Sequence, residues 1–145
     1  MAGYMTRLNG YVYDGHHLAA AALTNGLFVG LDSNNKVAPL SAANTDILMR
    51  VAEKTTLFGL PAVRLDVIAN NTESPVYFVE NEWDINDGVN YNEAEYTLAA
   101  GQYVKMHTPV VNDQLIVSVA SALYATLSVG DVVTPAANGT IAKAG

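Results

Sequence analysis

Two groups of residues in this sequence could do chemistry: a pair of adjacent histidines and a cluster of acids. His16 and His17 are neighbours, so in an extended chain their side chains point to opposite faces and make a poor metal chelate. His107 is far away in the sequence, and there is no cysteine. We therefore expect neither a zinc site nor a thiol nucleophile.

The acidic stretch ENEWDINDG resembles a calcium-binding loop in the spacing of its oxygen ligands. Counted from Glu82, Asp84 and Asn86 stand at the third and fifth positions, and Glu93 stands at the twelfth. The sixth position, where such a loop needs glycine for its sharp turn, is Asp87 instead. The pattern favours a solvated acidic loop and leaves a weak divalent-cation site as the alternative.

Other catalytic patterns do not stand out. Several acids could supply the carboxylate pair of a glycoside hydrolase, but so many candidates define no specific pair. They are Glu80, Glu82, Asp84, Glu93 and Glu95. The sequence has no Gly-x-Ser-x-Gly nucleophile elbow and no glycine-rich phosphate loop. We therefore expect no catalytic residues, no cofactor and no enzymatic activity.

Short strands separated by turn signals account for most of the chain. Alternating apolar residues predict a strand at 60–69, and β-forming residues predict strands at 76–83 and 114–120. Residues 94–108 hold one or two more strands. The count is about nine, with turn signals every 8–12 residues.

Two segments could form helices. Residues 41–58 place Ile47, Leu48 and Val51 on one helical face, but a strand over 47–52 fits nearly as well, so both remain open. The alanine-rich segment LAAAALT (18–24) predicts at most one or two helical turns, because it ends at Asn25-Gly26.

Two segments near the ends of the chain read as similar hairpins, GLFVGLDSNNKVAPL (26–40) and GDVVTPAANGTIAKAG (130–145). When Val29 is aligned with Val133, the turn dipeptides and the strands that follow them coincide. A looser third copy, GQYVKM (101–106), shares the pattern Gly-x-apolar-Val. Glycine allows a sharp turn into each strand, and the valine anchors it.

These elements predict a mainly β protein with one small domain, a sandwich or open barrel of short antiparallel strands, and at most one or two short helices. Residues 1–17 contain three tyrosines and three glycines without a sustained period. We expect them to form an extended N-terminal arm, with the β-rich domain at 18–145.

Charge is low and unevenly distributed. Only 14% of residues are charged, and the net charge is −7. Residues 65–104 carry eight acids and no Lys or Arg, which disfavours nucleic acid because its phosphates would be repelled. No apolar run is long enough to span a membrane, and no signal peptide is evident, so we expect synthesis in a cytoplasm.

The two hairpin segments resemble the strand–turn–strand phrases of capsid decoration (cement) proteins of tailed bacteriophages. The resemblance rests on Gly-Asp-x-Val followed by an Asn-Gly turn, on abundant Ala, Val and Thr, and on few charges. It covers about a third of the chain. It implies a virion structural protein, made in the cytoplasm of a bacterial host, that binds the exterior of an assembled capsid and bridges subunits of the major capsid protein.

The same resemblance implies a homotrimer or a staple between neighbouring subunits, and it carries over no catalytic residue. We expect the N-terminal arm to dock by adding a strand to the edge of a neighbour's sheet. Its anchors would be Tyr4, Arg7, Tyr11 and Tyr13. The alternative is a module of a virion that binds a host surface or a glycan, using Trp83, Tyr91, Tyr96 and the loop 84–93.

Overall fold

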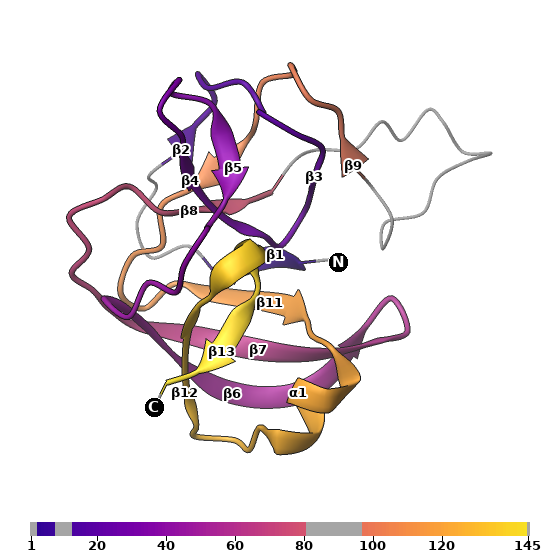
Figure 1. Cartoon of the computed structure of the whole chain (residues 1–145). Coiled ribbons are helices and arrows are strands. Elements are labelled where there is room, and N and C mark those ends of the chain that lie inside the picture. The colour runs from indigo at the N-terminus through magenta and orange to yellow at the C-terminus, as the bar shows by residue number, and fades with distance from the viewer. Residues whose placement is uncertain (1–2, 8–12, 81–96, 145) are drawn as a thin grey trace.

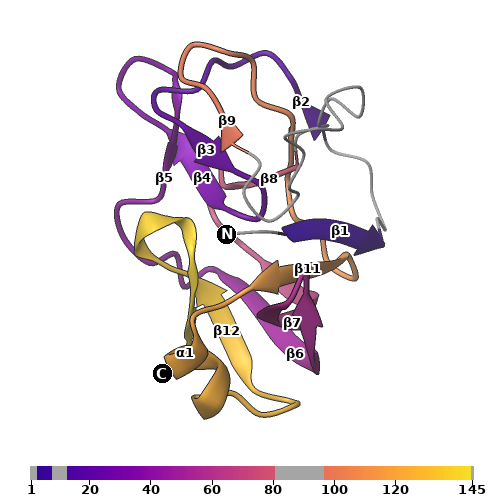
Figure 2. The ribbon, with the colours of Figure 1, turned by 90° about the vertical axis from the view of Figure 1, so that its right-hand side faces the viewer.

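The computed structural model describes residues 3–7, 13–80 and 97–144. Its strands form two main antiparallel sheets, which lie one above the other in Figure 1 and are seen from the side in Figure 2, and one two-stranded sheet. Within the described residues there is one short α-helix, α1 (Ser121–Thr126), and one short 3₁₀ helix, η2 (Ala137–Gly139). The mainly β fold expected from the sequence is confirmed, as is its small helical content.

The larger sheet has six strands in the order β1-β11-β7-β6-β12-β13. In that order they are Gly3–Arg7, Gln114–Ser118, Leu60–Asn70, Ile47–Leu57, Val132–Pro135 and Ile141–Lys143. The long strands β6 and β7 form a hairpin closed by a two-residue turn. Ile47, Met49 and Val51 are all fully buried, and this period of two shows that the segment left open between helix and strand is a strand.

The second sheet has five strands in the order β2-β10-β8-β4-β5. They are Tyr13–Asp14, Met106–His107, Tyr77–Val79, Phe28–Leu31 and Val37–Pro39. The two-stranded sheet pairs β3 (Leu23–Thr24) with β9 (Thr97–Leu98). The five-stranded sheet lies between the six-stranded sheet and the β3-β9 side of the molecule, so its central strands are buried on both faces.

Alternation along β4 and β8 creates the two cores. Phe28 and Phe78 point towards the six-stranded sheet, where their rings meet edge to face with centroids 5.2 Å apart. Their neighbours Val29 and Val79 point the other way, into a second cluster with Leu23. The two sheets therefore pack through a pair of aromatic rings from the smaller sheet.

The helical turns expected at 18–24 are not formed. Ala19 makes a parallel bridge with Val37, and Leu18 makes an antiparallel bridge with Tyr103. Main-chain hydrogen bonds join Val37 N to Leu18 O and Ala20 N to Val37 O, both at 2.8 Å. Helix propensity of alanine is small per residue, so these pairings with distant strands override it.

The expected similarity of the two hairpins is confirmed in their register. Val29 pairs with Pro39 and Leu31 with Val37 in the first hairpin, as Val133 pairs with Lys143 and Pro135 with Ile141 in the last. The turns also match, because Asp32 N bonds to Lys36 O just as Ala136 N bonds to Thr140 O. The glycines at 26, 101 and 130 all have positive φ, and the valines at 29, 104 and 133 are all fully buried.

Candidate docking surfaces

The segment expected to be a docking arm forms strands in its described part. Tyr4 lies in β1, which pairs with β11 of the same chain, and its side chain is 37% exposed. The backbone of Arg7 ends the same strand, and Tyr13 starts β2, which pairs with β10. Tyr11 lies outside the described residues. Of these four anchors, Tyr4 is the one whose side chain the structure places at the surface.

Strand β1 is held on both sides. A Cβ at Gly3 would lie only 2.8 Å from Gly26 Cα, so the strand fits closely against the backbone at Gly26 of the same chain. On its outer side, Met5 N donates a 3.1 Å hydrogen bond to Glu80 Oε2, and the same oxygen lies 3.7 Å from His107 Nε2. One carboxylate thus links β1 of the larger sheet to β10 of the smaller one.

The other candidate catalytic or metal-binding residues form no site among the residues that the structure describes. Across residues 3–7, 13–80 and 97–144, no group of three or more His, Asp or Glu is arranged to hold a metal ion. Most of the calcium-like loop and the aromatic residues of the glycan hypothesis lie outside the described residues. No helix in the described ranges is long and apolar enough to cross a membrane.

The turn between β6 and β7 exposes an aromatic residue. Phe58 and Gly59 form this two-residue turn, and both have a positive φ, 51° for Phe58 and 79° for Gly59. Such a turn favours Asn-Gly, because bulky side chains rarely adopt a positive φ. Nevertheless, position 58 carries phenylalanine with 45% of its surface exposed, next to Leu60 with 36% exposed. The turn therefore combines backbone strain with an exposed apolar surface.

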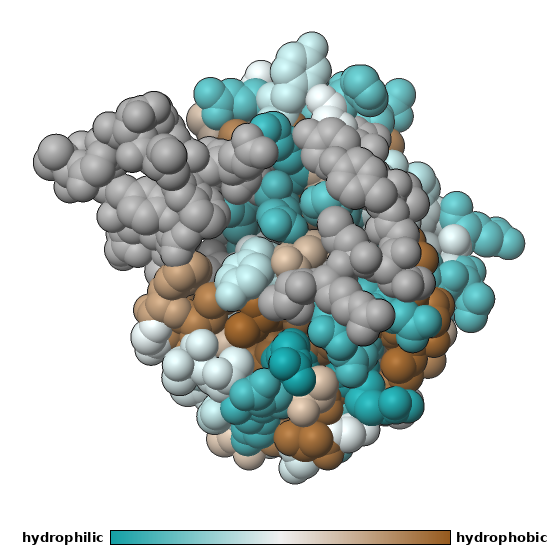
Figure 3. Space-filling model, turned by 180° about the vertical axis from the view of Figure 1, so that it is seen from behind, coloured by the Kyte–Doolittle hydropathy of each residue, from teal (hydrophilic) through white to brown (hydrophobic). Residues whose placement is uncertain are grey.

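The sequence predicted a strand after this turn, at 60–69, and left the segment before it open between helix and strand, so the turn itself was not predicted. The signal was the dipeptide Phe58-Gly59 between two β-forming runs, since glycine at the second position suits a tight hairpin. Seen from behind, the half of the molecule with the six-stranded sheet shows hydrophobic residues among hydrophilic ones (Figure 3). Exposure of the ring, however, could not be inferred from its neighbours in sequence.

An apolar groove of about 540 Å³ opens between β13 and α1. No charged residue lines it, and its walls come from segments that are distant in sequence. They are Leu60, Ser118, Val119, Ala120, Leu123, Thr140, Ile141 and Ala142. In Figure 1 β13 and the β6–β7 turn lie on opposite sides of α1. Leu60 both lines the groove and follows the turn of Phe58, so the groove and the turn are neighbouring features.

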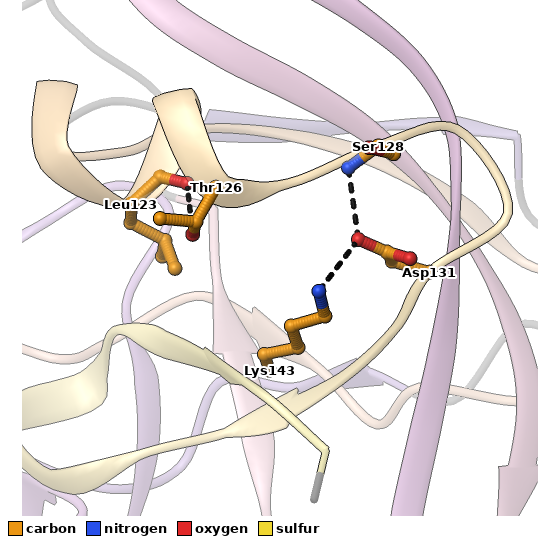
Figure 4. A network of polar contacts seen from close by, with 5 residues as sticks. All are labelled: Leu123, Thr126, Ser128, Asp131 and Lys143. Atoms are coloured by element: carbon orange, nitrogen blue, oxygen red, sulfur yellow. Dashed lines mark hydrogen bonds and ion pairs between the residues drawn. The ribbon is translucent and has the colours of Figure 1, made fainter.

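A polar contact fixes the end of β13 beside this groove (Figure 4). Asp131 Oδ2 accepts a 2.8 Å hydrogen bond from Ser128 N and lies 3.3 Å from Lys143 Nζ. The Ser128 amide, together with the ammonium of Lys143, lowers the pKa of Asp131 below its ordinary value of 3.8. Lys143 therefore meets a charged carboxylate near neutral pH, and their charges offset each other.

Comparisons with protein-family models, with curated proteins and with solved structures returned no match for this chain.

Proposed function

We propose that the chain is a virion structural protein that binds the outer surface of an assembled phage capsid and bridges subunits of its major capsid protein. The resemblance of the hairpin segments to capsid decoration proteins motivates this proposal. The low charge and the mainly β fold are compatible with it. Its virion location and its bacterial host belong to the same proposal.

The exposed Phe58 is the observation that carries the proposal. A non-glycine residue in the left-handed conformation costs about 1–2 kcal/mol. Within the chain the side chain is only partly buried, because 45% of its surface remains exposed. Aromatic side chains are enriched at the centres of protein interfaces, where they fill pockets of the partner. Docking of Phe58 into a pocket on the shell would offset the strain.

Tyr4 is a second proposed contact on the shell. Among the tyrosines expected to anchor the N-terminal arm, Tyr4 is the one that the structure shows to be exposed. Because Gly3–Arg7 is an integral strand of the six-stranded sheet, deletion of residues 2–13 would remove part of the fold as well as the contact. Substitution of Tyr4 by alanine tests the contact without removing the strand.

The experiment measures binding of the purified chain to shells assembled from the major capsid protein alone. We expect the wild type to co-sediment with shells, and Phe58→Asn to bind at least about tenfold more weakly, as for a central aromatic contact. Val129→Ala is the matched control, because Val129 is also an exposed apolar residue in a turn. A wild-type chain that leaves shells unbound would refute the proposed function, and equal binding of Phe58→Asn would refute the contact.

A further inference from the structure

Strand β13 is the open edge of the six-stranded sheet. On the outer side of β1, Glu80 accepts a hydrogen bond from Met5 N, and the outer side of β5 is occupied by residues 18–20. In contrast, β13 pairs only with β12, and no other described residue forms a main-chain hydrogen bond with Ile141–Lys143. Unpaired edges are templates for adding a strand from another chain.

The register of β13 shows which of its groups point outwards. Ala136 N bonds to Thr140 O at 2.8 Å, and Ala144 N bonds to Val132 O at 2.9 Å. In an antiparallel pair the hydrogen-bonded positions alternate, so the main-chain N–H and C=O of Ala142 also point towards β12. The N–H and C=O groups of Ile141 and Lys143 therefore point away from β12, towards the open edge.

We propose that two copies of this chain pair antiparallel through β13, around a two-fold axis at Ala142. In this register Ile141 of one copy stands opposite Lys143 of the second copy, and each carries outward main-chain groups. The two equivalent pairs exchange four hydrogen bonds, which join the two six-stranded sheets into one. A two-fold interface requires such self-complementarity: if residue 141 of one copy contacts residue 143 of the second, then residue 143 of the first must contact residue 141 of the second.

The side chains suit the same axis. Ala142 of each copy meets Ala142 of the other at a non-hydrogen-bonded position, where Cα atoms approach to about 4.5 Å and a small side chain fits. The two Lys143 ammonium groups do not stand opposite each other, and each lies 3.3 Å from an Asp131 carboxylate. Like charges directly opposite would destabilise the pairing.

The groove beside β13 fits a second copy. Each copy has a net charge of −7, but no charged residue lines the groove. The lining therefore adds no electrostatic repulsion against a second acidic copy. Leu60, Val119 and Leu123 offer apolar surface to the incoming strand, including the aliphatic stem of its lysine. A dimer would carry two Phe58 rings. If the proposed function is correct, it could contact two shell subunits at once and gain avidity.

The absence of cysteine allows a direct test by cross-linking. Cysteine at position 142 would meet its symmetry equivalent at a Cα distance within the 4.4–6.8 Å range of disulfides. Under mild oxidation we expect Ala142→Cys to form a covalent dimer, at protein concentrations where the control Val129→Cys remains mostly monomeric. Val129 is a suitable control because it is 66% exposed. Failure of Ala142→Cys to cross-link faster than the control would overturn the proposal.

Sedimentation equilibrium tests the hydrogen bonds. Lys143→Pro removes the outward N–H, whereas Lys143→Ala removes the same side chain and keeps that N–H. We expect the wild type and Lys143→Ala to be dimers and Lys143→Pro to dissociate at least about tenfold more readily, because one bond is lost from each copy. Circular dichroism checks that each variant is folded. A monomeric or trimeric wild type would overturn the two-fold pairing, whatever the outcome of shell binding.

If Lys143→Pro fails to fold, Ala142→Lys replaces it. This substitution brings two ammonium groups together at the axis, so we expect it to give a folded monomer. A dimer of unchanged stability would overturn the proposed register.

Discussion

Asn138 N donates a 2.7 Å hydrogen bond to Leu40 O, so the turn of the last hairpin contacts the residue that directly follows the first hairpin. The next residue, Gly139, is buried against Phe28 and Leu27, which belong to the start of that first hairpin. Two segments that resemble each other in sequence thus also contact each other. Their contact connects the two main sheets near the aromatic pair Phe28–Phe78.

Gly139→Ala should destabilise the fold more than Gly59→Ala. Both glycines have a φ of 79°, so alanine meets the same backbone strain of about 1 kcal/mol at either position. At position 139 the added Cβ would also lie 2.9 Å from Phe28 O, whereas at position 59 nothing lies within 4 Å. We expect a further loss of about 1–3 kcal/mol for Gly139→Ala, measured by urea unfolding. Equal losses would contradict this close packing.

Phe58→Asn should leave the stability of the isolated chain nearly unchanged. Asparagine tolerates positive φ and precedes Gly59, which makes the favoured Asn-Gly turn. Relief of backbone strain should add about 1 kcal/mol to the free energy of unfolding, and loss of the buried part of the ring should offset it, so we expect a net change within about 1 kcal/mol. Thermal and urea unfolding measure it, with Val129→Ala as the surface control. A loss of more than about 2 kcal/mol, as for a buried aromatic residue, would mean that the ring contributes to the fold rather than to docking.

The ion pair of Asp131 should make stability depend on pH in the acid range. The pKa of Asp131 is lowered in the folded protein by the Ser128 amide and by Lys143, so the ionised form stabilises the fold. Its contribution is complete above 3.8, the ordinary value, and is lost as the pH falls below 3.8 through the folded pKa. The stability difference between the wild type and Asp131→Asn should therefore shrink below that pH.

Lys143→Ala provides the comparison for this titration. It removes the part of the lowered pKa that Lys143 causes and keeps the Ser128 amide and the charge of Lys54, so we expect a smaller pH-dependent contribution from Asp131 than in the wild type. Urea unfolding over a pH series measures both variants. A constant difference between the wild type and Asp131→Asn across the series would be inconsistent with the contact in Figure 4.

Glu80→Ala should loosen β1. The variant removes the acceptor for Met5 N and the carboxylate near His107, so β1 loses its hydrogen bond on the side away from β11. We expect faster amide hydrogen exchange in β1 and a loss of about 1 kcal/mol in stability, typical of one hydrogen bond. Glu80→Gln is the matched control, because its side-chain oxygen can still accept from Met5. Unchanged exchange of the Met5 amide in Glu80→Ala would rule out this clamp.

Local signals predicted part of this fold from the sequence. Asn34-Asn35 and Asn138-Gly139 lie in turns that take positive φ, and they set the register of both hairpins. The alternation of buried residues in β7 follows the period of two that predicted it. These features were accessible because turn geometry and strand periodicity depend on residues close together in the chain.

Long-range contacts decided the rest. Residues 18–20 pair with β5 instead of forming helical turns, because main-chain partners from distant strands outweigh alanine's propensity. The described part of the expected arm became strands of both sheets for the same reason.

The candidate docking features divide in the same way. The sequence by itself determined the mainly β class, the paired hairpins and the low charge of the surface. Only the tertiary structure decided that Phe58 is exposed, that β13 is left as an open edge, and that Leu60, Leu123 and Ile141 meet around one groove. Exposure and edges depend on which strands pair across the whole chain, and this pairing is a property of the complete fold.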